Sequence, residues 1–247
     1  MTSTDVYLSA VVPAFNEAQR IANTLRRLHN YLAGSCLSYE ILVVLDGPTD
    51  GTRDVLRSLS AEIHHVRILD RAVNRGKGFT VREGMLEARG QIRLFTDADN
   101  STDIAHFDQM KTLFDEGCDL VIASRNPKDV PGARQTVSQP WYKRSIGKLG
   151  NLLVQRVAVP GIWDTQCGFK AFRAEAAERI FSKLTIDRWG FDIEVLALAR
   201  ALNYKIGIIP ARWINDDRSH VKLPDYLRVL RDTFKVRANF LTGKYGL

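Results

Sequence analysis

The sequence has few cysteines and no long apolar run, and each absence excludes a class of protein. Cys36, Cys118 and Cys167 are scattered over 247 residues and form no C-x-x-C pair. We therefore predict neither a disulfide framework nor a zinc site, and we expect a reducing compartment. No apolar stretch reaches the roughly 18 residues that a membrane-spanning helix needs, and no secretory signal pattern stands at the start. These features predict a cytoplasmic protein that meets a membrane only peripherally, at its cytoplasmic face.

Acidic residues are outnumbered by basic ones. The 28 Asp and Glu residues face 35 Lys and Arg residues, which gives a net charge of +7 and an isoelectric point near 9.4. Such a surplus indicates an anionic partner such as a nucleotide, a phosphate, a nucleic acid or a membrane surface. The apolar fraction of 45% is that of an ordinary globular chain, and nothing in the sequence resembles an internal linker. We therefore expect one domain over residues 1–247.

Apolar runs alternate with helical patterns in the first half of the chain. The strands are expected at Val6–Phe15, Tyr39–Gly47, His64–Leu69, Gln91–Asp97 and Cys118–Ser124. Between them lie helical patterns, among them Phe79–Gly90, with Gly90 expected as a left-handed C-terminal cap, and Asp103–Glu116. This alternation predicts an α/β fold with a mostly parallel sheet covered by helices on both faces.

The pattern changes after Arg125. The later elements are expected to be a loop over Asn126–Pro140, a basic helical stretch over Trp141–Val157, strands at Cys167–Arg173 and Tyr204–Ile214, helices at Ala174–Phe181 and Phe191–Leu202, and an amphipathic helix from Pro224 to Leu241. We divide the chain into residues 1–125, residues 126–223 and a closing helix over 224–247.

Polar clusters follow the predicted strands of the first half. They lie at Pro13–Glu17, Asp46–Thr52, Asn74–Gly78 and Asp97–Asp99. Because the carboxyl ends of parallel strands share one edge of a sheet, these four loops are expected to converge on a ligand site.

Asp97 and Asp99 form a D-x-D pair at the end of an apolar strand. Two residues apart, their side chains point the same way, and such carboxylates suit Mg²⁺ or Mn²⁺ bound together with a diphosphate. The alternative is a solvated turn that caps a helix. Arg75, Gly76 and Lys77 stand at a predicted helix start, where an anion is favoured, although a plain basic loop would read the same way.

Several segments together resemble a known family. They are VVPAFNEAQRI, EILVVLDGPTDGT, NRGKGFTVREGM, LFTDADNST, IASR, DTQCGFKAF and GFDIEVLALAR. In order and spacing the chain resembles the family 2 glycosyltransferases of the GT-A fold, and among them the dolichyl- and polyprenyl-phosphate glucosyltransferases and mannosyltransferases. The resemblance runs from about Val6 to Gly243. It implies metal-dependent, inverting transfer of a hexose from a nucleotide sugar, UDP-glucose before GDP-mannose, to a polyprenyl or dolichyl phosphate.

The resemblance also implies roles for particular residues. The expected nucleotide-sugar site consists of Pro13, Ala14, Glu17, Asp46, Arg75, Gly76, Lys77, Asp97 and Ala98. Asp97 and Asp99 would hold Mg²⁺ or Mn²⁺, and Asp99 and Lys77 would act in catalysis by stabilising the leaving diphosphate. Leu45 and Pro48 depart from the usual family residues, so the nucleobase is left open.

The acceptor decides whether a base is needed. A hydroxyl acceptor needs one, and Asp192 and Glu194 are the candidates; a phosphate monoester is already largely ionised and needs cations instead. Between Arg125 and Arg156 seven cations stand against Asp129. The expected acceptor-phosphate residues are Arg125 and Arg144 and, from the resemblance, Gln166, Lys170, Ser219, His220 and Lys222.

The closing helix carries apolar and basic stripes, so it is expected either to lie in a membrane interface or to pack on the domain. Two other functions are open: a family 2 transferase with a soluble or cell-envelope hydroxyl acceptor, and a non-catalytic nucleotide- or nucleic-acid-binding protein. No nucleic-acid-binding module is recognised, so we expect no nucleic-acid partner. The oligomeric state cannot be predicted.

Overall fold

The structure is a computed structural model that describes residues 6–135, 150–213 and 223–247. Its centre is a seven-stranded sheet in the order β3-β2-β1-β4-β7-β5-β8. The strands are β1 (Leu8–Ala14), β2 (Tyr39–Asp46), β3 (Val66–Arg71), β4 (Ile92–Thr96), β5 (Leu120–Ser124), β7 (Phe169–Arg173) and β8 (Ile206–Pro210). All neighbouring strands run parallel except β7, which is antiparallel to β4 and β5. The predicted α/β fold with a mostly parallel sheet is therefore confirmed.

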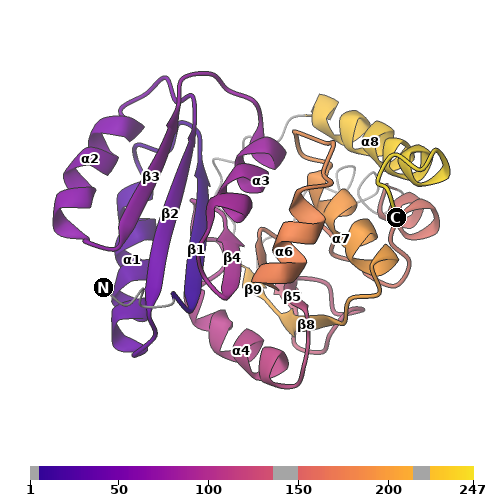
Figure 1. Ribbon diagram of the computed structural model, residues 1–247, viewed down its shortest axis with the longest axis horizontal. Helices are drawn as coiled ribbons and strands as arrows, with labels where there is room; N and C mark the ends of the chain where they lie inside the picture. Colours follow the sequence, from indigo (N-terminus) through magenta and orange to yellow (C-terminus); the bar gives the residue numbers. More distant parts are fainter. Residues whose placement is uncertain (1–5, 136–149, 214–222) are drawn as a thin grey trace.

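Helices cover both faces of this sheet (Figure 1). They are α1 (Ile21–Gly34), α2 (Thr52–Glu62), α3 (Lys77–Glu87), α4 (Phe107–Asp115), α6 (Ala174–Phe181), α7 (Phe191–Ala201) and α8 (Leu223–Leu241), with a 3-10 turn, η1, at Ile104–His106. Residues 150–157 are helical as well. Among the described helices, none is both long and apolar enough to cross a membrane.

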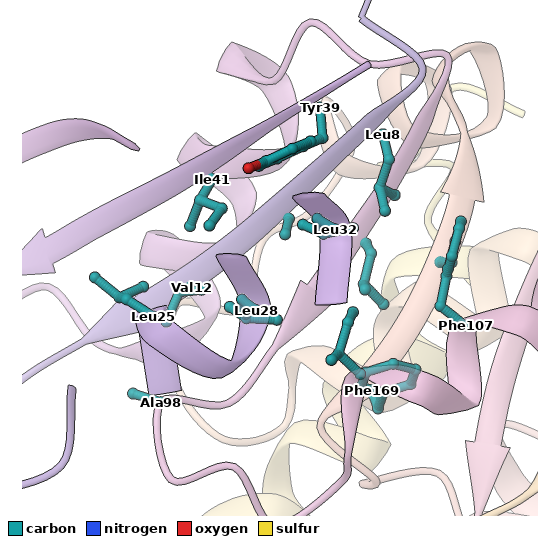
Figure 2. Packing of buried hydrophobic residues seen from close by; sticks show 14 of the residues in the cluster. Leu8, Val12, Leu25, Leu28, Leu32, Tyr39, Ile41, Ala98, Phe107 and Phe169 are labelled. Carbon is teal, nitrogen blue, oxygen red and sulfur yellow. The ribbon is translucent and has the colours of Figure 1, made fainter. Parts of the chain in front are cut away.

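Side chains alternate between two apolar clusters because successive residues of a strand point to opposite faces. In β1, Leu8 and Val12 join the cluster under α1, α2 and α4, and Figure 2 shows them beside Leu25, Leu28 and Leu32 of α1. Val11 points to the opposite cluster, which α3, α6, α7 and α8 cover. The strands β1, β2, β4 and β5 are buried on both faces, which explains their near-continuous apolar sequences.

The strand β7 joins the two parts of the chain. It comes from the later part, yet it lies between β4 and β5 of the first part. β8 then extends the same sheet beyond β5. The molecule is therefore a single α/β domain whose sheet runs through both predicted functional halves.

The prediction that Gly90 caps α3 is wrong. The helix ends at Glu87, and Ala88 after it is already extended. Gly90 instead approaches β1: its N–H donates to Ser9 Oγ, and a Cβ there would lie 2.5 Å from the Ser9 nitrogen. The glycine is needed for this close backbone approach, which its sequence position alone did not distinguish from a helix cap.

The strand predicted at Tyr204–Ile214 is interrupted. β8 ends at Pro210, which has no N–H to continue a ladder, and the Ala211 N–H donates to Ser124. Beyond it, β9 (Arg212–Trp213) pairs with β6 (Arg134–Gln135) in a separate two-stranded sheet. The chain thus pairs with β5 up to the end of β8 and with β6 beyond it.

The three cysteines form no disulfide bond: Cys36, Cys118 and Cys167 are all free.

Candidate active site

The D-x-D pair lies in a turn that directly follows β4. The Asp97 N–H donates to Gly168 O at 3.1 Å, Thr24 Oγ1 donates to Ala98 O at 2.6 Å, and the Ser101 N–H donates to Asp99 Oδ1 at 2.9 Å. Asn100 completes the turn in the left-handed region, with φ of 54°, which asparagine tolerates. The backbone is held from three sides, and both carboxylates are left partly exposed.

Gly168 fits against the Asp97 carboxylate and was not singled out from the sequence. A Cβ at this glycine would lie 2.1 Å from Asp97 Oδ2, so any larger residue would displace the carboxylate. The one sequence signal was a glycine directly before a buried strand, a position that often marks close backbone approach. The segment before β7 therefore shapes the aspartate site.

Lys77, at the first turn of α3, faces the same carboxylate. Its Nζ lies 2.6 Å from Asp97 Oδ1 and 5.3 Å from the ring centre of Trp189. Burial lowers the pKa of Lys77, but the Asp97 and Asp192 carboxylates outweigh burial and hold that pKa above its usual value. The side chain is thus a fixed ammonium group beside the D-x-D pair.

Asp46 holds the loop that carries Lys77. It is 3% exposed, and its carboxylate accepts from the Arg75 and Gly76 N–H groups at 2.7 and 2.8 Å. Arg71 Nη1 donates to it as well, at 3.1 Å. The resemblance placed Asp46 in the nucleotide-sugar site; in the structure its carboxylate is bound to the loop that carries Lys77.

The remaining donor-side residues surround the ends of β1 and β3. Pro13 and Ala14 end β1, and Glu17 follows, paired with Arg20 by a 2.9 Å bond from Nη2 to Oε1. Arg75 is exposed, with its guanidinium 3.6 Å from the ring centre of Phe79. These residues lie in the loops that follow parallel strands, at the carboxyl edge of the sheet where the sequence placed the nucleotide.

Lys170 does not lie where an acceptor phosphate could reach it. Its side chain is fully buried in β7, with Nζ 2.5 Å from Asp192 Oδ1 and 2.6 Å from Cys167 O. Burial raises the pKa of Asp192, while the Lys170 and Lys77 ammonium groups act in the opposite direction. We therefore assign Lys170 and Asp192 to a buried ion pair beneath the site.

Glu194 is likewise committed to internal contacts. It is fully buried and accepts from the Ile186 N–H, the Thr185 N–H and hydroxyl, and the Tyr245 hydroxyl. A general base must reach the proton that it removes. This arrangement favours a structural role for Glu194, tying α7 to residues 185–186 and to the chain end.

Arg125, on the acceptor side, is bound to Asp164. The pair is bidentate, with Nε–Oδ2 and Nη2–Oδ1 distances of 2.7 and 2.8 Å. Burial raises the pKa of Asp164, but the Arg125 guanidinium outweighs burial and holds that pKa below its usual value. Asp129, the one acid among the seven cations, accepts from the Trp163 and Asp164 N–H groups at 2.7 and 2.8 Å. These contacts join the segment after β5 to the segment before β7.

The structure gives less information on the other residues predicted to bind the acceptor phosphate. Gln166 is exposed two residues before Gly168, in the segment that borders Asp97. Arg144, Ser219, His220 and Lys222 lie outside the described residues.

The donor atoms present fit a divalent cation that binds together with a diphosphate. Within the described ranges no group of three or more His, Cys, Asp or Glu side chains surrounds a common point. Asp97 and Asp99 supply two carboxylates, and Ser101 Oγ beside them is buried with no hydrogen-bond partner in the described structure. Mg²⁺ and Mn²⁺ are commonly held by one or two carboxylates with phosphates and water filling the other positions.

Comparisons with known proteins identify the family of this chain. The family model described as glycosyl transferase family 2 matches residues 9–181. A dolichyl-phosphate beta-glucosyltransferase of Trichomonas vaginalis is 35% identical over 98% of this chain and 76% of its own length. The human dolichyl-phosphate beta-glucosyltransferase is 32% identical over 97% of this chain and 78% of its own.

Solved structures share the fold at low identity. Mannosyl-3-phosphoglycerate synthase from Rubrobacter xylanophilus superimposes with a TM-score of 0.67 at 18% identity, covering 98% of this chain and 76% of its own. Glucosyl-3-phosphoglycerate synthase from Mycobacterium tuberculosis, crystallised with Mn²⁺, UDP and phosphoglyceric acid, gives 0.64 at 18% identity, covering 98% and 79%. The family match and the relatives above 30% identity show that the chain is a glycosyltransferase of family 2, built on the GT-A fold.

Proposed function

We propose that this enzyme transfers a glucosyl group from UDP-glucose to a dolichyl or polyprenyl phosphate, with inversion at the sugar carbon. The support for the sugar and the lipid comes from relatives named dolichyl-phosphate beta-glucosyltransferase at 31–36% identity. GDP-mannose is the second donor to test, because Leu45 and Pro48 leave the nucleobase undetermined by motif.

The acceptor assignment rests on one observation: both acids of α7 are bound to groups inside the fold. Asp192 is paired with buried Lys170, and Glu194 is surrounded by four hydrogen-bond donors. A hydroxyl acceptor would need one of them as its base. A phosphate monoester is mostly ionised near neutral pH, since its second pKa is about 6. The site therefore favours a phosphate acceptor over a hydroxyl acceptor.

On the donor side, Asp97 and Asp99 would hold Mg²⁺ or Mn²⁺, and the cation would supply positive charge at the diphosphate. Lys77, fixed beside Asp97 at 2.6 Å, would donate hydrogen bonds to the departing diphosphate. Because its ammonium is already in place, little reorganisation is needed as charge develops there. Asp46 serves this arrangement by holding the backbone of Arg75 and Gly76.

We assign the chain to three tasks. Residues 1–125 bind the donor, except Arg125 itself, which we assign to the acceptor together with residues 126–223, among them Gln166 and the cations after Arg125. Residues 224–247 form the closing helix, which would rest on the cytoplasmic face of a membrane where a lipid phosphate is found. The enzyme would then be a peripheral protein that takes its donor from the cytoplasm.

The test is thermal unfolding with UDP-glucose, UDP, GDP-mannose or GDP, each with and without Mg²⁺ or Mn²⁺. A ligand at a hundred times its dissociation constant adds about 2.7 kcal/mol, which for a chain of this size raises Tm by about 5–10 °C. We expect this shift with UDP and UDP-glucose, only in the presence of metal. Asp99→Asn should abolish it, because one carboxylate charge is lost.

Asp103→Asn is the matched control, since Asp103 accepts from the Ala105 N–H in the next turn and lies outside the site. Glucose transfer to a short-chain polyprenyl phosphate completes the test. A shift with GDP-mannose alone would reassign the donor, and transfer to a hydroxyl acceptor but not to the lipid phosphate would refute the acceptor.

A further inference from the structure

The outward face of α8 carries a stripe of apolar side chains that are exposed to solvent. Leu227, Phe234 and Leu241 are 69%, 54% and 74% exposed. They are spaced by seven residues, close to two helical turns, so they lie in one line along the helix. Large apolar side chains that lie together on an exposed face commonly mark an interaction surface. We call these three residues the outer stripe.

Basic residues border this stripe on both sides. Arg231 and Arg237 each lie three residues from Phe234, in opposite directions, which places them about 60° to either side of it. Both are exposed, and exposed Arg228 extends the basic border beyond Arg231. An apolar centre with cations on its flanks is the pattern of a helix that lies in the interface of an anionic bilayer.

The opposite face of α8 is fixed to the enzyme. Thr233 and Val236 are fully buried, and a Cβ on Gly190 would lie 2.6 Å from Asp232 Cβ. Figure 1 shows α8 lying on α7, on the side of the molecule away from α2. The outer stripe is thus presented by a helix that is anchored to the domain along its inner side.

The anchored side leads to the donor loop. Asn239 Nδ2 and Lys235 Nζ donate to Thr185 Oγ1 and O, both at 3.0 Å. Two residues further along that segment, Asp187 O accepts from the Phe79 N–H at 3.0 Å, and Trp189 lies against Lys77. Residues 185–189 therefore lie between α8 and the loop that carries Lys77.

We propose that the outer stripe and its flanking cations are a docking surface for a membrane that contains anionic lipids. A second copy of the chain is a poorer occupant, since a symmetric contact through this face would bring like charges together. The bilayer matches both features: acyl chains accept the stripe, and anionic headgroups accept the arginines. The inference rests on the proposed function for its purpose, because docking would bring the donor loop to a lipid-borne phosphate.

The test is co-sedimentation of the whole chain, without nucleotide, with phosphatidylcholine vesicles and with vesicles that also contain phosphatidylglycerol. We expect at least about tenfold tighter binding to the anionic vesicles, since each basic residue near such a surface contributes measurably, and weaker binding at high salt. The triple variant L227D/F234D/L241D should lose at least about tenfold. Leu86→Asp, a change at an exposed leucine of α3, should bind like the parent chain.

Charge reversal provides a second arm. Arg231→Glu with Arg237→Glu should weaken binding to anionic vesicles, whereas Arg27→Glu with Arg57→Glu, on exposed positions of α1 and α2, should not. Equal binding to both vesicle types, or no effect of the triple variant, would overturn the proposal. A dimer in size-exclusion chromatography that the triple variant dissociates would overturn it as well, in favour of a second copy.

Transfer to a short, water-soluble prenyl phosphate without vesicles separates the two claims. The triple variant should retain this activity, because no residue of the outer stripe touches the site. If vesicle binding fails while transfer proceeds, the docking surface alone is refuted. If binding succeeds while no transfer to any lipid phosphate occurs, the proposed function is refuted.

Discussion

Lys77 and Asp97 are held in contact by two neighbouring residues, Asp46 and Gly168. Asp46 fixes the loop before Lys77 through two backbone N–H groups, and Gly168 leaves the space in which the Asp97 carboxylate lies. Positioning of this kind matters because displacement of a reacting group by about 1 Å can reduce the rate by about a hundredfold. At the scale of the residue, the site therefore depends on a glycine, Gly168, as much as on charged side chains.

Gly168→Ala tests this dependence. The added methyl carbon would lie 2.1 Å from Asp97 Oδ2, so the carboxylate must leave its present position beside Lys77. We expect glucose transfer to fall about a hundredfold, with weaker metal-dependent nucleotide binding measured by calorimetry. Gly34→Ala is the control, because a Cβ at Gly34 meets nothing within 4 Å. Unchanged transfer by Gly168→Ala in a folded protein would show that the placement of Asp97 is not critical.

At the scale of the element, Glu40 of β2 ties three neighbouring segments together. It accepts from Ser9 Oγ of β1 and from the Arg89 N–H after α3, at 2.6 and 2.8 Å, and Arg67 Nε of β3 lies 3.2 Å from its other oxygen. Burial raises the pKa of Glu40, but these hydrogen bonds and the guanidinium outweigh burial and hold it below its usual value. The same cluster brings Gly90 against β1.

Because the folded pKa of Glu40 lies below the unfolded value of about 4.3, its stabilising effect is fully present above that value. It is lost as the pH falls through the folded pKa. We expect Glu40→Gln to lower the free energy of unfolding near pH 6.5 by about 1–3 kcal/mol and to lose less stability than the parent chain between pH 5 and pH 3.

Urea unfolding at several pH values measures both effects. Glu62→Gln is the control, since the Glu62 side chain is 54% exposed in a surface pair with Arg26. A parallel loss of stability with acid in Glu40→Gln and in the parent chain would assign the acid sensitivity to other carboxylates.

At the scale of the whole molecule, the donor and acceptor assignments do not correspond to separate folding units. The sheet order places β7 between β4 and β5, and buried Phe169 and Phe172 of β7 contribute to the two opposite clusters. Removal of the later part would expose one edge of β4 and both edges of β5, together with the apolar surfaces that α6 and α7 cover. Unfolding of such a shared core is expected to be cooperative.

A fragment of residues 1–125 should therefore show no cooperative unfolding transition, as measured by circular dichroism against temperature. In the whole chain, transitions followed by tryptophan fluorescence and by far-ultraviolet circular dichroism should coincide. All four tryptophans lie after residue 125, so fluorescence reports only on the later part. Two separated midpoints, or a fragment that unfolds cooperatively, would show that the donor part folds independently.

The architecture, and the edge of the sheet on which the polar loops meet, could be predicted from the sequence alone. Doubly buried strands such as β1 and β2 need apolar residues throughout their length, and helices of one apolar face need regular spacing, so both are visible as local patterns. The polar residues after these strands, such as Lys77 and Asp97, could be assigned to one edge because parallel strands share their direction. Local chemistry and a single topological rule were enough for this part.

Only the tertiary structure decided which charged groups face outward and which are paired within the fold. Lys170, Glu194 and Asp46 look like site residues in the sequence, yet their partners come from elements 22 residues (Asp192), 51 residues (Tyr245) and 29 residues (Arg75) away in the chain. The role of Gly168 likewise depends on Asp97, a carboxylate in the turn after β4 that lies far from it in the sequence. Whether a charged side chain is buried or paired depends on residues that are distant in the sequence, so the residue type alone does not indicate it.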